Sequence, residues 1–218
     1  AYTVGSYGIA MLIPLGKLIL SVACATALFI CVVALIASVF TGINFFHVIR
    51  ALKDILFLAF STASSEAALP GAMKRLEELG VPKTIVTFVM PTGYSFNLDG
   101  STLYSSAGIL FIAQLYGIQM PIEQQLLVMV TLMLSTKGIA GVPGAGIIVV
   151  AATAAAFNLP TEGVAILLGI DRLLDMIRTI CNVCGNCMAT VVVACWEKEL
   201  NKATFNEKYR AFLGGKNS

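Results

Sequence analysis

An uncharged stretch at residues 18–41 constrains the fold of this chain more than any other feature. At a rise of about 1.5 Å per residue, a helix of this length crosses a hydrocarbon core of roughly 30 Å. We therefore predict a transmembrane helix within residues 1–46. A secretory signal is not expected, because the stretch is longer than the apolar core of such a signal and Lys17 follows an uncharged arm. The chain begins with Ala1 rather than methionine, which suggests a fragment.

The charges elsewhere indicate on which side of a membrane each connecting segment lies. Hydrophobic residues make up 58% of the chain and charged residues 12%, which is more apolar than an average soluble domain. Residues 119–125 and 157–162 contain acids but no Lys or Arg. Basic residues form three groups: Arg50 and Lys53; Lys74, Arg75 and Lys83; and Lys198, Lys202, Lys208, Arg210 and Lys216. By the positive-inside rule these groups are cytoplasmic, the N-terminus starts outside, and residues 198–218 form a polar cytoplasmic tail.

Residues 50–80 fit a re-entrant hairpin. Both ends are predicted on the same side, and the roughly twenty residues between the basic groups are too few for two crossings. The middle of the segment, residues 61–65, consists of small and hydroxyl-bearing residues, which suits a tip where the backbone leaves the helix. An amphipathic helix in the membrane interface is the alternative, and composition alone does not decide between the two.

A second interrupted region follows. Residues 84–117 are predicted to cross outward, but Pro91, Gly93 and the polar run 95–102 indicate an unwound transmembrane helix. Residues 121–158 leave and re-enter the outer face around a Gly-rich centre at 135–146, which predicts a second re-entrant hairpin of opposite orientation. Such a pair is typical of inverted repeats with a binding site near the membrane midplane. With an amphipathic transmembrane helix at 161–197, the predicted fold class is an all-α polytopic membrane protein.

The last predicted helix carries a stripe of polar side chains. Asp171, Asp175, Arg178, Asn182 and Asn186 follow one another at steps of four, three, four and four residues, which places them on one face. Ionisable groups at membrane depth cost several kcal/mol, so the default interpretation is a functional site. The alternative is a self-neutralising pair of Asp175 and Arg178 that holds helices together.

The chemistry of this stripe predicts the class of ligand. A guanidinium is a planar, bidentate partner for a carboxylate, and a carboxylate one turn away is a partner for an ammonium. Arg178 and Asp175 together therefore describe an amino acid with an acidic side chain. Backbone N–H groups at broken helix ends, including the Gly-rich tip at 138–146, could hold its other carboxylate. For that tip, a turn that merely reverses the chain is the alternative.

Three separate segments carry a resemblance to a known family. They read NLDGS at 97–101, GVPGAG at 141–146 and DRLLDMIRTICNVCGN at 171–186. With them, essentially from residue 1 to about 200, the chain resembles the dicarboxylate/amino acid:cation symporter family, the glutamate transporters. The likeness is greatest to the bacterial proton/glutamate symport members. The resemblance implies a secondary active symporter for glutamate or aspartate, multi-pass in the bacterial plasma (inner) membrane.

The resemblance also implies an elevator mechanism, in which a transport domain with two hairpins slides against a trimeric scaffold. Residues 1–198 would be a portion of that transport domain, and the scaffold helices of the homotrimer have no counterpart here. Membrane lipids are further expected partners, whereas a cofactor, an enzymatic activity and nucleic-acid binding are not expected.

The resemblance assigns roles to individual residues of the pocket. It implies that Arg178 binds the side-chain carboxylate and Asp175 the amino group. Thr179, Asn182 and Ser101 would complete the pocket, while Ser64, Ser65 and the backbone of Val142 and Gly146 would hold the main-chain carboxylate.

Two departures from the family pattern bear on the coupling ion. Sodium-driven members have an aspartate where this chain has Asn186, and an amide is a poorer ligand for a hard cation than a carboxylate. Lys137 falls in a segment that binds sodium in the relatives, where a fixed positive charge would oppose or replace the ion. A lysine that extends to the outer interface is the alternative. Both departures favour protons over sodium.

Ion coupling is expected to involve polar residues on several segments. The carboxylate that carries the proton is left open among Asp171, Asp99 and Glu66. Asp99 belongs to a sodium site in the relatives, so sodium coupling remains the alternative. The residues assigned to ion coupling are Asp171, Asn97, Asp99, Ser95, Asn186, Lys137 and Glu66.

Asp175 also bears on the substrate. The C4-dicarboxylate carriers of this family lack an acidic residue at the amino-binding position, and malate or succinate has no ammonium to neutralise Asp175. Glutamate or aspartate is therefore expected, with a C4-dicarboxylate such as succinate, malate or fumarate as the alternative. Glutamate and aspartate are not ranked, because one methylene changes affinity by only about 1–3 kcal/mol.

Cysteines suggest an interpretation from a different class. Cys181, Cys184 and Cys187 form a C-x-x-C-x-x-C run, as in a metal or iron–sulfur binding membrane subunit. The run is interleaved with the polar stripe and no fourth ligand follows nearby, so packing as small hydrophobic side chains is preferred. His47, the only histidine, is expected to be solvated or to cap a helix, and Trp196 to anchor at the interface.

Overall fold

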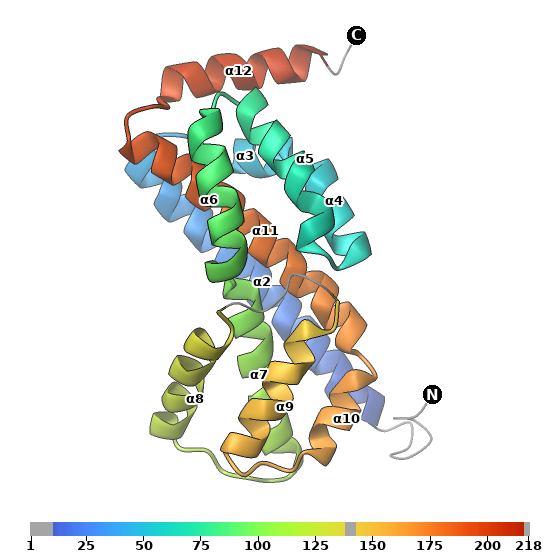
Figure 1. Ribbon diagram of the computed structural model, residues 1–218. Helices are drawn as coiled ribbons and strands as arrows, with labels where there is room; N and C mark the ends of the chain where they lie inside the picture. Colours follow the sequence, from blue (N-terminus) through green and yellow to red (C-terminus); the bar gives the residue numbers. More distant parts are fainter. Residues whose placement is uncertain (1–10, 138–142, 216–218) are drawn as a thin grey trace.

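The computed structural model describes residues 11–137 and 143–215, and its regular elements are α-helices (Figure 1). The predicted all-helical class is confirmed for these residues. Their bounds are α2 (Leu12–Thr41), α3 (Phe45–Ala51), α4 (Lys53–Thr62), α5 (Ser65–Glu78), α6 (Lys83–Phe96), α7 (Asp99–Leu115), α8 (Ile122–Ser135), α9 (Ala145–Ala156), α10 (Glu162–Leu168), α11 (Asp171–Trp196) and α12 (Lys202–Gly215).

Two long helices, α2 and α11, pack along each other and organise the molecule (Figure 1). Both are long and apolar enough to cross a membrane. Only 17% of the most apolar window of α2 is buried, against 67% for α11, so α11 is the central helix and α2 lies outside it. α2 ends at Thr41 because Gly42 adopts φ +71 and its N–H bonds the carbonyl of Ser38.

The segment predicted as the first hairpin contains a tight helix pair. α4 ends at Thr62, Ala63 has φ +51, and Ser64 begins α5 by accepting the N–H of Ala67 at 3.3 Å. The reversal thus lies within residues 61–65. A further short helix, α3, precedes the pair, and the side chain of Asn44 caps it.

The next two helices, α6 and α7, are separated by a break. The break falls at Asn97 and Leu98, whose ψ angles of 74° and 50° are not helical. Pro91 lies inside α6 without ending it. The polar run, rather than the proline, therefore marks where the helix unwinds.

The second predicted hairpin contains α8 and α9, which flank residues 138–142. These residues, including the predicted ligand Val142, lie outside the described part of the chain. Figure 1 shows the α4–α5 pair on the α12 side of the molecule and α8 and α9 at the opposite end. The segment predicted as one helix at 161–197 comprises two, because the helix is interrupted at Gly169 and Ile170 before α11 begins.

The hydrophobic core is divided into two clusters that lie at opposite ends of α11. One contains Val183, Cys184 and Val191 of α11 with side chains of α3 to α6 and α12. The other contains Leu174 with side chains of α7 to α10. The polar residues between Leu174 and Val183 therefore lie at the junction of the two clusters.

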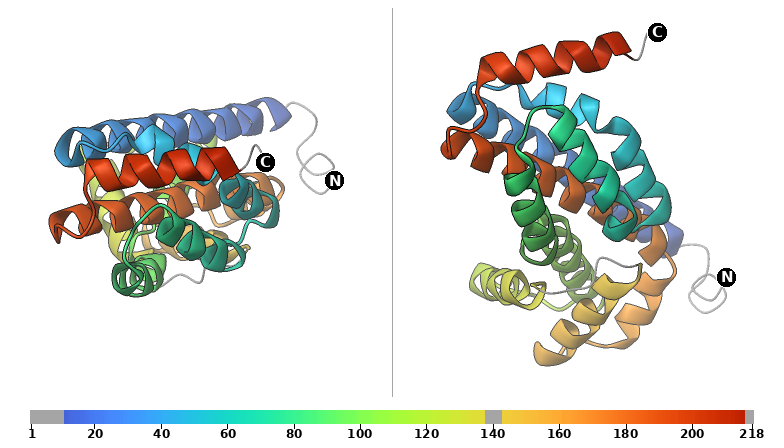
Figure 2. Two further views of the ribbon diagram at one scale, coloured as in Figure 1. Left: turned by 90° about the horizontal axis from the view of Figure 1, so that it is seen from above. Right: turned by 45° about the horizontal axis from the view of Figure 1, so that its top comes forward.

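The segment predicted as a polar cytoplasmic tail contains a packed helix, α12. α12 lies across the end of the bundle (Figures 1 and 2), and the Asn201 side chain accepts the N–H of Thr204 at its start. Phe205 and Tyr209, one turn apart, are 0% and 5% exposed. The Tyr209 ring stacks on His47 at 4.6 Å, so His47 packs against α12 rather than being solvated.

We expect Phe205→Ala to destabilise the protein, because truncating a buried Phe costs about 3–5 kcal/mol. The melting temperature of the detergent-solubilised full-length protein should fall by several degrees. Phe88→Ala is the matched control, since Phe88 is 72% exposed. Equal melting temperatures for the two variants would contradict the packing of α12.

Candidate functional site

The polar stripe of α11 is buried, and its residues from Asp175 to Asn182 lie at the junction of the two core clusters. Asp175, Arg178 and Thr179 are 1%, 3% and 2% exposed, and Asn182 and Asn186 are 6% and 4%. Side chains of this kind are buried only where they find partners. The predicted face is therefore the interior face of the helix.

Asp175 and Arg178 form an ion pair. Asp175 Oδ1 lies 2.5 Å from Arg178 Nη2. The two residues are three apart on α11, so the pair forms within one helix and does not itself join two helices. Among the described residues, Arg178 Nε is buried without a hydrogen-bond partner. The guanidinium thus keeps a donor available for another acceptor.

The N-terminus of α9 packs directly against this pair. The N–H of Gly144 donates to the second oxygen of Asp175 at 2.9 Å, and Gly144 adopts φ +80, which favours glycine. A Cβ on Gly146 would lie 2.9 Å from the Tyr104 ring and 3.0 Å from Arg178 Nη1. The absence of a side chain at Gly146 therefore allows the backbone to approach the guanidinium.

Asp171 has a partner that sequence reasoning missed. The Tyr104 hydroxyl of α7 donates to Asp171 Oδ1 at 2.6 Å, and Tyr104 is 1% exposed. A buried tyrosine near the polar run of α7 is a weak sequence signal, because aromatic residues are also common in apolar cores.

Asn182 links α11 to the start of α7. Its Oδ1 accepts the N–H of Gly100 at 2.9 Å, and its Nδ2 donates to Ser101 Oγ at 3.0 Å. A Cβ on Gly100 would lie 2.4 Å from the carbonyl oxygen of Arg178. The backbone at the start of α7 therefore contacts the backbone of α11 at Arg178, a member of the ion pair.

Asn186 links α11 to α6, as Asn182 links α11 to α7. Its Nδ2 donates to the carbonyl of Met90 at 2.9 Å, whereas its Oδ1 is buried without a partner among the described residues. Asn97, with its amide oriented to satisfy both neighbours, donates to Asp99 Oδ2 at 2.8 Å and accepts the N–H of Asn186 at 3.1 Å. Asn97, Asp99 and Asn186 therefore form one polar cluster at the helix break.

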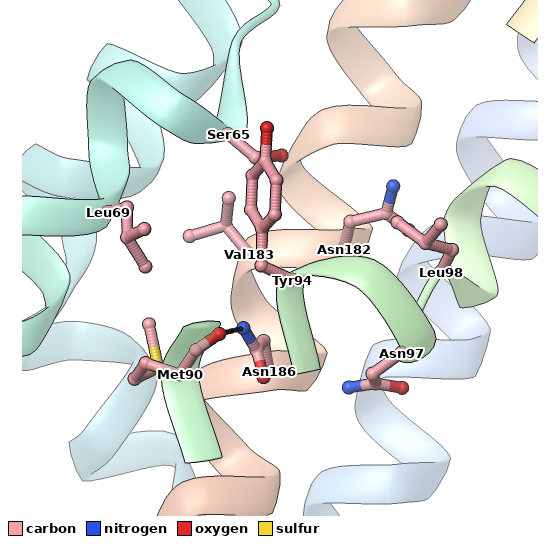
Figure 3. Close-up of a pocket in the computed structure, with 9 residues that line it drawn as sticks. All are labelled: Ser65, Leu69, Met90, Tyr94, Asn97, Leu98, Asn182, Val183 and Asn186. Atoms are coloured by element: carbon pink, nitrogen blue, oxygen red, sulfur yellow. Dashed lines mark hydrogen bonds between the residues drawn. The ribbon is translucent and has the colours of Figure 1, made fainter. Parts of the chain in front are cut away.

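A small cavity borders this cluster (Figure 3). Its volume is about 10 Å³, close to the room that one water needs. The polar residues Ser65, Tyr94, Asn97, Asn182 and Asn186 line it, together with apolar side chains. The cavity thus joins residues predicted to bind substrate with residues predicted to serve ion coupling.

Lys137 lies at the end of α8 and points toward the break between α6 and α7. Its Nζ donates to the carbonyl of Phe96, the last residue of α6, at 2.6 Å. The preceding hydroxyl, Thr136 Oγ1, lies 3.0 Å from Thr102 Oγ1 of α7. A positive charge is favourable there because the C-terminal end of a helix carries partial negative charge.

The other predicted residues are less central. Thr179 donates to the carbonyl of Asp175 within its own helix, and the Ser64 hydroxyl caps α5. Glu66 is exposed and accepts the Tyr94 hydroxyl at 2.8 Å, a partner that the sequence did not indicate. Ser95 is half-buried on the last turn of α6.

Comparison with known proteins identifies the family. Residues 1–196 match the sequence profile described as the sodium:dicarboxylate symporter family. The chain belongs to this family. The resemblance seen in the three motifs is thereby confirmed, and membership together with the apolar helices α2 and α11 makes this a membrane protein.

Several relatives of this symporter-family chain have curated names. It is 52% identical over 200 residues to the proton/sodium-glutamate symport protein of Geobacillus stearothermophilus, covering 92% of this chain and 48% of the relative. It is 48% identical to the proton/glutamate-aspartate symporter of Escherichia coli (strain K12), covering 98% and 49%. It is 44% identical to the C4-dicarboxylate transport protein of Burkholderia pseudomallei (strain 668), covering 99% and 50%. The chain spans about half the length of these relatives.

The cysteines of this symporter-family chain lie in packed positions. Cys181, Cys184 and Cys187 are buried and form no disulfide, and Cys184 and Cys187 belong to a hydrophobic core cluster. Within residues 11–137 and 143–215, His, Cys, Asp and Glu side chains form no group of three that could hold a metal ion.

We expect Gly100→Ala to disrupt the site, because the new Cβ would overlap the Arg178 carbonyl and overpacking costs about 1–3 kcal/mol. Gly16→Ala is the matched control: Gly16 is also helical, and nothing lies within 4 Å of its added Cβ. In detergent, Gly100→Ala should lower the melting temperature and Gly16→Ala should leave it unchanged or raise it slightly. Similar values for both would contradict the close approach of α7 to α11.

Proposed function

We propose that this chain is the substrate-binding portion of a symporter that takes up glutamate or aspartate together with protons across the bacterial plasma (inner) membrane. The observation that carries the proposal is the buried Arg178 guanidinium, which lies beside the Asp175 carboxylate and has one donor without a partner in the described part of the chain. The names of the proton/sodium-glutamate and proton/glutamate-aspartate relatives support it.

Binding would exchange one set of ionic partners for another. In the structure, Asp175 and Arg178 neutralise each other. An acidic amino acid brings both an ammonium for Asp175 and a side-chain carboxylate for Arg178, so it can replace the internal pair without leaving either charge buried alone. A ligand with only one of these groups would leave one protein charge uncompensated.

The remaining contacts would come from the elements around this pair. Ser64, Ser65 and the backbone at Gly146 and Val142 would hold the main-chain carboxylate, with Thr179, Asn182 and Ser101 completing the pocket. The position of Gly146 beside Arg178 supports this arrangement, while the role of Val142 rests on the sequence resemblance alone.

We further propose that the α4–α5 pair and the α8–α9 region are re-entrant hairpins of an elevator-type transport domain. Supporting this, the two regions lie at opposite ends of the molecule, and polar groups from the α4–α5 turn, the α6–α7 break and the start of α9 lie near the buried stripe of α11. The relatives are about twice as long as this chain, and the scaffold helices of a homotrimer would belong to the part that this chain does not cover.

Proton coupling is supported by the groups at the helix break. Asn186 supplies a neutral amide, and the Lys137 ammonium interacts electrostatically with Asp99 and bonds the end of α6. A sodium ion placed there would meet a positive charge already in position. The proton carrier remains one of three hydrogen-bonded carboxylates: Asp171 with Tyr104, Asp99 with Asn97, or Glu66 with Tyr94.

The second candidate is C4-dicarboxylate transport, because the Burkholderia pseudomallei relative carries that name. Asp175 argues against it. A ligand with two carboxylates would place its second negative charge near this buried carboxylate, and a buried like-charge pair is unfavourable.

The decisive test is uptake by the full-length protein in proteoliposomes, with labelled glutamate and aspartate and succinate as competitor. We expect an inward proton gradient to drive uptake. Arg178→Ala should reduce it at least about 100-fold, because the substrate carboxylate would lose its charged partner, and truncating one partner of a buried charge pair costs about 2–5 kcal/mol of binding. Arg50→Ala, at an exposed arginine of α3, is the control. Uptake of succinate without glutamate would instead favour the second candidate.

Lys137→Gln separates proton from sodium coupling. Removing the ammonium leaves the negative end of α6 and Asp99 without their internal cation, so added sodium should then increase glutamate uptake by about threefold or more. Lys83→Gln, which removes a lysine at the opposite end of α6, should show no such sodium effect. A sodium requirement in the unmodified protein would overturn the proton-coupling proposal and leave the substrate assignment intact.

A further inference from the structure

Arg172 lies in the first turn of α11 and reaches the end of α4. Its Nη2 donates to the carbonyl oxygens of Thr62 at 3.1 Å and Ser61 at 3.4 Å. The last carbonyls of a helix have no N–H partner within the helix, and both oxygens belong to that last turn. The neighbouring carbonyl of Phe60 accepts the N–H of Ala63. One guanidinium nitrogen therefore satisfies the two carbonyls that end α4.

The turn held by this contact is unfavourable on its own. Ala63 has φ +51 and ψ 36, in the left-handed region where a residue with a Cβ is uncommon. Its side chain is fully buried. A conformation of this kind persists where surrounding contacts determine it, and Arg172 supplies one of them from a different helix.

The geometry and charge of Arg172 suit this position. The C-terminal end of α4 carries partial negative charge, which favours a cation, and a planar guanidinium can donate to two adjacent carbonyls. Arg172 also interacts electrostatically with Asp175, and its neighbour Asp171 bonds Tyr104. One stretch of α11 thus connects the α4–α5 turn with α7 and with the start of α9.

We propose that Arg172 is a positioning residue that holds the α4–α5 turn against α11 and so places Ser64 and Ser65 for the main-chain carboxylate of the substrate. The role of the two serines rests on the proposed function, whereas the contact of Arg172 with α4 does not. Ser65 borders the same cavity as Asn182, which supports a link between the turn and the pocket. The contact lies outside the ion pair that defines the substrate class.

The test uses Arg172→Gln, Arg172→Lys and Arg50→Gln in the full-length protein. In proteoliposomes, Arg172→Gln should raise the KM for glutamate at least about tenfold while the maximal rate per folded transporter changes by less than about threefold. Arg172→Lys keeps the charge but loses the planar fork, so its KM should rise about threefold. Arg50→Gln removes an exposed arginine and should leave KM unchanged.

Amide hydrogen exchange provides the second readout. The amides of residues 62–66 should exchange at least about tenfold faster in Arg172→Gln, with no change in Arg50→Gln. Faster exchange with an unchanged KM would show that the contact is purely structural and would overturn the positioning role. If neither the exchange rate nor KM changed, the positioning role would also be overturned.

Two further outcomes are also decisive. If the unmodified protein takes up no acidic amino acid, the proposed function fails, and unchanged exchange at residues 62–66 would still overturn the Arg172 contact. If Arg172→Gln does not fold, Arg172→Lys is used in its place. A KM and an exchange rate at residues 62–66 equal to those of the unmodified protein would then overturn the proposal.

Discussion

Asp175 and Arg178 place two opposite charges 2.5 Å apart inside a membrane protein, and the surrounding architecture follows from this pair. An ionised group in a low-dielectric interior is tolerated only if its partner and further hydrogen bonds compensate for lost water. The N–H of Gly144 supplies one of these bonds. Continuous helices have no free N–H groups to offer, because their own turns use them, so a helix must begin beside the pair. The interrupted helices are therefore a requirement of the site.

Charged side chains at this site meet helix ends of the opposite polarity. Asp175 accepts a hydrogen bond from the N-terminus of α9. Lys137 donates to a carbonyl at the C-terminus of α6, and Arg172 donates to carbonyls at the C-terminus of α4. Each contact pairs a full charge with the partial charge of a helix end, which is favourable and acts over a short range. A shift of any one of these helix ends would separate it from the charged side chain that compensates it. In such an arrangement, charge and helix position are coupled.

Local pattern predicted some of these features and missed others. The stripe from Asp171 to Asn186 was predicted to share one face because helical periodicity depends only on spacing, and the structure buries it from Asp175 to Asn186 and leaves Asp171 half-buried. The polar run at 95–102 indicated a break, and the break lies at Asn97 and Leu98. The cytoplasmic location of residues 198–218 stays a prediction, and the sequence did not indicate that this polar segment contains a helix packed through Phe205 and Tyr209. Tyr104, Tyr94 and Arg172 were missed as partners because each bonds a residue far away in the sequence.

The sequence by itself determined the helical class, the apolar spans, the family and the identity of the charged pair, since these depend on composition, spacing and motif. Only the tertiary structure decided which groups compensate those charges. Gly100, Gly144 and Gly146 belong to motifs that the sequence singled out, and in the fold they mark places where backbone approaches a polar side chain or another backbone. Such contacts join residues that are tens of positions apart, and no local pattern encodes the distance between them. The physical reason is that burial, which makes each polar partner necessary, exists only after the helices have packed.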